Sequence, residues 1–335
     1  MRMEQEYISD IGEFAFIDLI KNDTINRPKR VIYSIGDDCA VYKADSNKDQ
    51  IITTDMMVED VHFSKETITA YQLGYRLGAA NLSDIAAMGG TPLEAVISIA
   101  LPHYTSVFFC KEFYKGIKKI FKRYKVNLIG GDTVSSPSKM VINLTVIGEV
   151  PSGKAIYRHG SKVDDIVFVT NTVGSSAAGL YALQHEIADY RAIKRAHLMP
   201  EPQVKIGKSL LKSGAHALND ISDGLSSELN EIAQASHVIM EIDESAIPLH
   251  KQTLKLAKEI GESPYHFAWY GGEDFQLVGT MNEDDFEACK ARPHLTPIGR
   301  VVGKVKKGEA GIVRVKTIAG ETSIMNARGY NHFYK

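Results

Sequence analysis

Apolar runs in the first half of the chain alternate with segments of helical periodicity. Four β-branched runs, each bounded by glycine, proline or charge, predict strands at residues 51–55, 95–101, 126–130 and 140–150. Between them, residues 70–88 and 106–124 carry apolar side chains at spacings of three and four, which predicts helices. This alternation predicts a mixed α/β domain.

A second domain is predicted after a stretch of turn-forming residues. Residues 151–165 are rich in glycine, serine and charge, as is typical of a domain boundary. Strand and helix signals then resume at residues 166–170, 216–220, 226–236, 237–243, about 250–260 and 275–280. The tail from about residue 300 is basic and spaced by glycines, which favours further strands. We therefore expect two α/β domains, residues 1–150 and 151–335.

Composition narrows the class of protein. Hydrophobic residues make up 44% and charged residues 24%, as in an ordinary soluble globular protein. A net charge of -2 gives no general attraction for nucleic acid or anionic membranes, so neither is an expected partner. The start of the chain is too polar for a signal peptide, and no apolar run approaches the roughly 18 residues of a membrane span. We expect a cytoplasmic protein, whose distant cysteines, Cys39, Cys110 and Cys289, are reduced.

Acidic residues gather where predicted strands end, often beside glycine. These residues are Asp37, Asp38, Asp55, Asp60, Asp132, Asp220, Asp223, Glu273 and Asp274. Ligands of open α/β sheets collect at strand ends, so these acids could converge, together with Asp84 of the predicted helix 70–88. A single Asp in such a place is usually a turn residue or helix cap. Several converging carboxylates, however, repel one another unless cations hold them, which favours Mg²⁺ or Ca²⁺.

Several common sites are excluded by spacing. Aligning Gly224 with the sixth position of an EF-hand loop puts Ile221 at the third position and Asn230 at the twelfth, so the DISDG stretch is not an EF-hand. The chain has no P-loop, no G-x-G-x-x-G after a strand, no H-E-x-x-H and no G-x-S-x-G. What remains is an Asp-rich site with glycine turns, which suits a nucleotide whose phosphates are bridged to the protein by Mg²⁺.

Six motifs, in their order and separations, resemble the thiamine-monophosphate kinase family. They are IGDDCAV (35–41), TTDMMVEDVHF (53–63), AANLSDIAAMGGTP (79–92), IGGDTVSS (129–136), NDISDGLSSEL (219–229) and GGEDFQL (271–277). The match runs from about Ile11 to the last residues. The resemblance implies the two-domain fold of aminoimidazole ribonucleotide synthetase, with an N-terminal mixed sheet at the interface of a homodimer. It also implies phosphoryl transfer from ATP to thiamine monophosphate, with several Mg²⁺ ions and K⁺.

The resemblance also implies roles for individual residues. An N-terminal domain binding ATP and Mg²⁺ would be completed by the C-terminal domain. The implied metal ligands are Asp38, Thr53, Thr54, Asp55, Asp84, Asp132, Asp220 and Asp223, of which Asp55 and Asp223 are also the catalytic candidates. The implied ATP contacts are Tyr114, Gly131, Asp132, Arg158 and Ser222. The implied substrate contacts are His62, Glu273 and Tyr330, the last at a place where many relatives have Trp.

Structural roles stay open for several of these residues. Tyr114 could serve helix packing, Arg158 could be a solvated loop charge, His62 could be a hydrogen-bonded histidine at a strand end, and Glu273 could belong to a plain turn. Among proteins of the same fold, selenophosphate synthetase is disfavoured because residues 1–12 contain neither Cys nor Lys. The hydrogenase-maturation relative is disfavoured because the chain ends in NHFYK without a cysteine. Aminoimidazole ribonucleotide synthetase, a nucleotide-binding regulator without turnover and an acidic scaffold remain as alternatives.

Overall fold

The computed structural model describes residues 6–35, 40–289, 295–306 and 308–329. The chain divides into two compact units. The first comprises Met1–Ile85 and Thr91–Gly153, and the second comprises Ala86–Gly90 and Lys154–Lys335. Within the described residues, no helix combines the length and apolar character that a membrane crossing needs.

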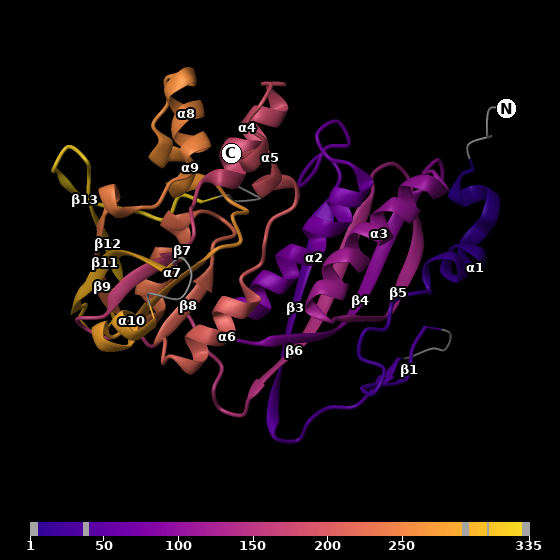
Figure 1. Cartoon of the computed structure of the whole chain (residues 1–335), viewed down its shortest axis with the longest axis horizontal. Coiled ribbons are helices and arrows are strands. Elements are labelled where there is room, and N and C mark those ends of the chain that lie inside the picture. The colour runs from indigo at the N-terminus through magenta and orange to yellow at the C-terminus, as the bar shows by residue number, and fades with distance from the viewer. Residues whose placement is uncertain (1–5, 36–39, 290–294, 307, 330–335) are drawn as a thin grey trace. The chain divides into compact units, whose positions relative to one another are not determined.

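The first unit is built on a mixed four-stranded sheet of order β3-β6-β4-β5. Its strands are β3 (Lys48–Val58), β4 (Thr91–Pro102), β5 (Asn127–Ser136) and β6 (Val141–Pro151). β6 is antiparallel to both β3 and β4, whereas β4 and β5 run parallel. Helices α2 (Ala70–Ala87) and α3 (Val107–Tyr124) lie side by side over one face of this sheet (Figure 1).

Glycines let α2 and α3 approach each other closely. A Cβ on Gly74 of α2 would overlap the carbonyl oxygen of Phe113, and a Cβ on Gly116 of α3 would overlap that of Tyr71. The two helix backbones are therefore in direct contact, which only glycine permits at these two positions.

The two faces of the four-stranded sheet differ in burial. Along β3, side chains alternate between a helix-covered face, where Met57 is buried, and an opposite face, where Ile52 is 72% and Met56 52% exposed. Val134 of β5 is 51% exposed. The opposite face thus presents large apolar side chains to solvent.

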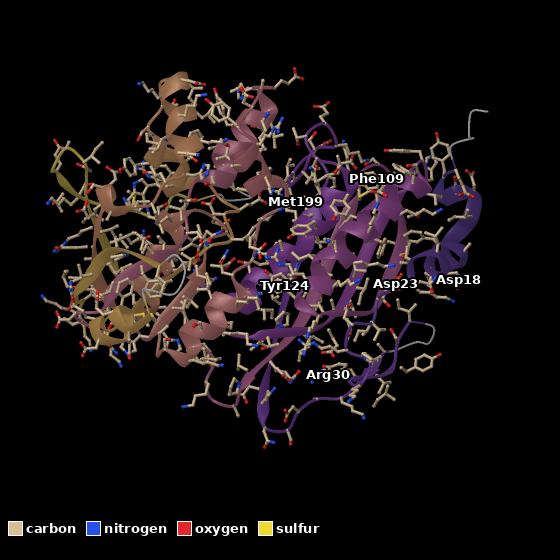
Figure 2. All side chains as sticks on the ribbon, in the orientation of Figure 1. Asp18, Asp23, Arg30, Phe109, Tyr124 and Met199 are labelled. Carbon is tan, nitrogen blue, oxygen red and sulfur yellow. The ribbon has the colours of Figure 1, made fainter. Side chains whose placement is uncertain are left out.

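A charged cluster joins the beginning of the chain to one end of this sheet. After α1 (Ile8–Ile20), Arg30 precedes a small hairpin of β1 (Val31–Tyr33) and β2 (Val41–Tyr42). Arg30 Nε donates to the buried Glu94 of β4 at 3.0 Å, and Arg30 Nη1 lies 3.5 Å from Glu149 of β6 (Arg30 is labelled in Figure 2). Lys48 of β3 forms a second ion pair with Glu149.

The second unit is built on a seven-stranded sheet of order β13-β12-β9-β11-β7-β10-β8, in which only the β12–β9 pair is parallel. Its strands are β7 (Ile166–Thr170), β8 (Ala217–Asp220), β9 (Val238–Asp243), β10 (Leu277–Met281), β11 (Leu295–Lys304), β12 (Ile312–Lys316) and β13 (Thr322–Ile324). Its helices are α4 (Ser175–Gln184), α5 (Arg191–Leu198), α6 (Val204–Lys212), α7 (Leu225–Ser236), the short η1 (Glu244–Ala246), α8 (Lys251–Ile260), α9 (Pro264–Tyr270) and α10 (Glu283–Cys289). Apolar residues of α7, including Leu225, Leu229 and Ile232, complete the core over the sheet.

The strands and helices predicted in both halves are confirmed, and the fold is the expected mixed α/β architecture. One positional expectation is wrong. Asp55 and Asp132 lie inside β3 and β5 and not at strand ends, because both strands continue past them in register with β6 and β4.

Candidate functional site

In the first unit, three predicted metal ligands share the helix-covered side of the sheet. Thr53 and Asp55 alternate with the exposed residues of β3 and therefore point to the same side as the buried Met57. The Thr53 hydroxyl donates a hydrogen bond to the Asp84 carboxylate, which extends from α2. Thr53, Asp55 and Asp84 thus place oxygen ligands between β3 and α2.

Two other predicted ligands lie on the opposite face. The Thr54 hydroxyl is 3.0 Å from the Thr145 hydroxyl and accepts from the Asn143 side-chain amide at 3.0 Å. Asp132 shares a row of paired residues with Ser98, Asn143 and the exposed Met56. The sheet therefore separates the side chains of Thr54 and Asp132 from that of Asp84, a consequence of strand pleating that a list of motifs cannot reveal.

His62 has a defined hydrogen-bonding state. The backbone N–H of Val58 donates to His62 Nδ1 at 3.0 Å, so a neutral ring carries its proton on Nε2. This contact matches the hydrogen-bonded histidine that the sequence left open.

Tyr114 lies in the interior of the first unit. Its side chain is 3% exposed, and its ring makes edge contacts with Phe16 at 5.9 Å and Phe113 at 5.4 Å between centroids. Burial raises the pKa of its hydroxyl. In this structure Tyr114 has a packing role, while Gly131 is exposed on β5. Contact of Tyr114 with adenine stays a prediction.

In the second unit, two motifs distant in sequence lie against each other. Asp220 is buried at the end of β8, and Ser222 and Asp223 follow it in the loop before α7. The N–H groups of Ile221, Phe275 and Glu273 donate to the carbonyls of Gln276, Ile221 and Ser222 at 2.7, 2.9 and 2.7 Å. The NDISDG and GGEDF motifs therefore form one backbone-bonded unit.

The conformation of GGEDF serves this contact. A Cβ on Gly272 would overlap the carbonyl oxygen of Ser222, so glycine is required by the neighbouring loop. Glu273 and Phe275 both adopt left-handed backbone conformations, with φ of 63° and 49°, which are unfavourable for residues other than glycine. In this structure the backbone at Gly272 therefore makes its close approach to Ser222.

The adjacent acids of GGEDF have different environments. The Glu273 carboxylate is partly exposed and lies 3.8 Å from Nδ1 of the buried His197, which is 3.1 Å from the Ser176 hydroxyl. Asp274 is buried and accepts from the N–H groups of Gly174 and Ser176 at the start of α4. Burial raises the pKa of Asp274 to about 7, against the lowering effect of these N–H donors. Glu273 is thus partly exposed beside His197, whereas Asp274 is buried and bonded to the backbone at the start of α4.

Sequence reasoning missed Glu228 and Asn219. Glu228 contacts Ser222 and Asp223, and Asn219 connects it to Arg158. Burial, followed by the nearby charge of Glu231, raises the pKa of Glu228 to about 8. A signal was present, since Glu228 interrupts the helical spacing of Leu225, Leu229 and Ile232 and so falls on the apolar face of its helix.

The oxygen donors fit Mg²⁺ in kind, because carboxylates and hydroxyls are the ligands that hard divalent cations take. Within the described residues, however, no three His, Cys, Asp or Glu side chains gather so that they could hold a metal ion. The predicted ligand Asp38 and the predicted substrate contact Tyr330 lie outside the described residues. Gly329 lies inside them, so close to Asp223 that a Cβ there would overlap its carbonyl oxygen.

Two family models match the chain. The model of the AIR synthase related protein N-terminal domain matches residues 36–150, and that of the C-terminal domain matches residues 162–316. The chain is 43% identical to the thiamine-monophosphate kinase of Bacillus subtilis (strain 168), over 96% of this chain and 100% of that protein.

Solved structures agree with these matches. The crystal structure of thiamine-monophosphate kinase from Stenotrophomonas maltophilia K279a has a TM-score of 0.80 and 31% identity, covering 93% of this chain and 98% of that one. A structure of AaThiL complexed with AMPPCP and TMP has a TM-score of 0.77 and 30% identity, covering 99% of both chains.

Proposed function

This chain belongs to the thiamine-monophosphate kinase family, and we propose that it transfers the γ-phosphoryl group of ATP to thiamine monophosphate, giving ADP and thiamine diphosphate. The observation that carries the proposal is the likeness over almost the whole chain to a structure complexed with AMPPCP, an ATP analogue, and TMP. In this proposal residues 1–150 bind ATP and Mg²⁺ and form the dimer, and residues 151–335 complete the site. Because ATP is available in the cytoplasm, we place the activity there.

Candidate Mg²⁺ ligands occur in each of the two units. Thr53, Asp55 and Asp84 lie on one side of the first sheet, and Asp220 and Asp223 lie at the end of β8. When bound, Mg²⁺ neutralises phosphate charge and so lets two anionic groups approach. A requirement for K⁺ belongs to the proposal and is tested by replacing K⁺ with Na⁺ in the assay.

The acceptor needs no general base. The second pKa of a phosphate monoester is about 6, so thiamine monophosphate already carries a nucleophilic dianion at neutral pH. The work left to the protein is to position two phosphates in line and to balance their charge. We therefore propose direct transfer without a phosphoenzyme. The exposed Arg158 contacts the phosphates of ATP, and the Glu273 carboxylate faces the cationic part of the substrate.

A homodimer is proposed from the exposed face of the first sheet. Ile52 and Met56 of β3 and Val134 of β5, on the two edge strands of the sheet, are large apolar side chains exposed on this face, and exposed apolar patches often mark an interface. A second copy of the chain, docked through the same face, would remove these side chains from water.

One assay separates the candidate functions. The chain, ATP and Mg²⁺ are incubated with thiamine, with thiamine monophosphate or with precursors of aminoimidazole ribonucleotide, and ADP and thiamine diphosphate are quantified. We expect ADP and thiamine diphosphate in equal amounts from thiamine monophosphate alone. ADP formed only with the aminoimidazole precursors would assign the synthetase reaction instead, and nucleotide binding without any ADP would indicate a regulator.

A further inference from the structure

The Glu228 carboxylate contacts the segment that carries two predicted site residues. Its Oε1 accepts from the Asp223 N–H at 3.1 Å and from the Ser222 hydroxyl at 3.3 Å. Its Oε2 accepts from the side-chain amide of Asn219. The whole residue is 2% exposed. A single buried side chain therefore connects three residues of the stretch 219–223.

Asn219 extends these contacts to a fourth residue. It lies buried on β8, and its Oδ1 accepts from Arg158 Nε at 3.1 Å. Its amide nitrogen also donates to Glu231 Oε2 at 2.9 Å, and Arg158 Nη1 lies 3.1 Å from the same Glu231 oxygen. A continuous chain of polar contacts thus runs from Arg158 through Asn219 and Glu228 to Ser222 and Asp223.

These contacts differ from ordinary helix capping. The N-cap of α7 is Gly224, and a capping side chain would accept from N–H groups in the first helical turn. Glu228 instead bonds to groups that precede the helix. It also lies on the same face as Leu225, Leu229 and Ile232, where an apolar residue would avoid the cost of burying a carboxyl group. An acid in the first turn also favours the helix through its dipole, but that effect does not require the contacts with Asn219 and Ser222.

We propose that Asn219 and Glu228 are positioning residues that hold Ser222 and Asp223 in a fixed arrangement relative to Arg158. This inference rests on the proposed function, in which Arg158 and Ser222 contact ATP and Asp223 binds Mg²⁺. Neither Asn219 nor Glu228 needs to touch a substrate. Their effect is to hold the Arg158 guanidinium and the Asp223 carboxylate so that both face the same polyphosphate.

The first test replaces one carboxylate oxygen of Glu228 by an amide nitrogen. Glu228→Gln keeps an oxygen for Ser222 and Asp223 but turns an amide donor toward Asn219, whose own oxygen is held by Arg158. We expect the ATP and Mg²⁺ concentrations at half-saturation to rise about 10- to 100-fold. The KM for thiamine monophosphate should change less than about twofold, a split that general loss of folded protein would not produce.

The second test restores the hydrogen bond between residues 219 and 228 by exchanging the amide and the carboxylate between the two positions. Asn219→Asp would face the Glu231 carboxylate, to which Asn219 now donates, so the single variants and the double variant Asn219→Asp with Glu228→Gln are compared in a Glu231→Gln background. In the double variant the new amide of residue 228 donates to the new carboxylate of residue 219, which still accepts from Arg158. We expect the double variant to recover at least about tenfold of the ATP affinity lost by either single variant. Glu262→Gln, an exposed Glu→Gln change on the loop after α8, is the matched control.

Each outcome bears on the inference. An unchanged ATP and Mg²⁺ dependence in Glu228→Gln would overturn it, as would a failure of the double variant to recover when all variants melt above the assay temperature. If Glu228→Gln does not fold, Asn219→Asp and the double variant decide by the same criterion. If the wild type makes no ADP from thiamine monophosphate, the proposed function fails separately. The positioning role is then tested by the rise in melting temperature that AMPPCP with Mg²⁺ causes. An equal rise in the wild type and in Glu228→Gln would reject the positioning role.

Discussion

At the residue scale, neighbouring acids in this chain have distinct chemical tasks. Glu273 and Asp274 are adjacent in sequence, yet one is partly exposed beside His197 and the other is buried against the start of α4. A shared carboxylate chemistry therefore does not give two residues the same role here, and the local contacts decide the role of each.

The predicted metal ligands should be essential for turnover. We expect Asp55→Asn and Asp223→Asn each to lower kcat by about 100-fold or more, because an amide cannot supply the negative charge that balances Mg²⁺. The melting temperature should change little, since both side chains are only partly buried. Steady-state kinetics beside thermal unfolding checks this, with the exposed Asp18→Asn as control. Near-normal kcat in both variants would contradict the metal-binding role.

Asp274 should make stability depend on pH. Its pKa is raised from 3.8 to about 7 by burial, so the folded state holds a proton that the unfolded state releases. Its stabilising contribution is fully present below about pH 4 and is lost as pH rises through about 7. We expect the free energy of unfolding to fall over that interval, in urea titrations at several pH values. Asp274→Asn should reduce the dependence of the unfolding free energy on pH. The dependence that remains reflects Glu228, whose pKa is raised to about 8 and whose effect has the same sign. An identical slope in Asp274→Asn would refute the assignment.

At the scale of elements, the charged cluster around Arg30 should stabilise the first unit. Arg30→Met would leave the carboxylate of the fully buried Glu94 without its ion-pair partner, and we expect a loss of about 3 kcal/mol in unfolding free energy. Lys21→Met removes the exposed pair with Asp18 and should cost less than about 0.5 kcal/mol. Denaturant unfolding compares the two. Equal effects of the two changes would show that the cluster around Arg30 contributes no more than a surface pair.

The sequence predicted elements better than it predicted which side chains meet. Strand and helix positions followed from local periodicity, so β3, β4, β6, α2 and α3 were all located. The face of the sheet on which a side chain lies depends on how its strand pairs with distant strands. In this sheet Thr53 lies on the same face as Asp84, whereas Thr54 lies on the opposite face. The helical spacing of Leu225, Leu229 and Ile232 could have marked Glu228 as facing the core, but its partners Asn219 and Asp223 follow only from the packing of α7 beside the end of β8.

At the scale of the whole molecule, the exposed sheet face predicts the oligomeric state. We expect the wild type to be a dimer by light scattering coupled to size-exclusion chromatography. Ile52→Lys, which places a charge on the exposed face of β3, should shift the protein toward monomer. Ile318→Lys changes an equally exposed isoleucine of the second unit and should leave the dimer intact. A monomeric wild type would refute the proposed interface.

The family of the chain was predictable from sequence because its motifs are long and occur in a fixed order. The match with a thiamine-monophosphate kinase over 96% of the chain confirms that resemblance. The site residues were assigned from their positions in those motifs. Such an assignment says which residues belong to the site but not how they are arranged in space. The backbone contact between Ser222 and Glu273 could not be predicted, because about fifty residues and several elements separate the two.

The backbone bonding of NDISDG to GGEDF has a consequence for local opening. Neither loop can leave its partner without exposing the amides of Ile221, Glu273 and Phe275 together, since each donates across the junction. Release would also relieve two unfavourable φ angles, so the junction should come apart in a single step and not fray. In native-state hydrogen–deuterium exchange these three amides should share one protection factor.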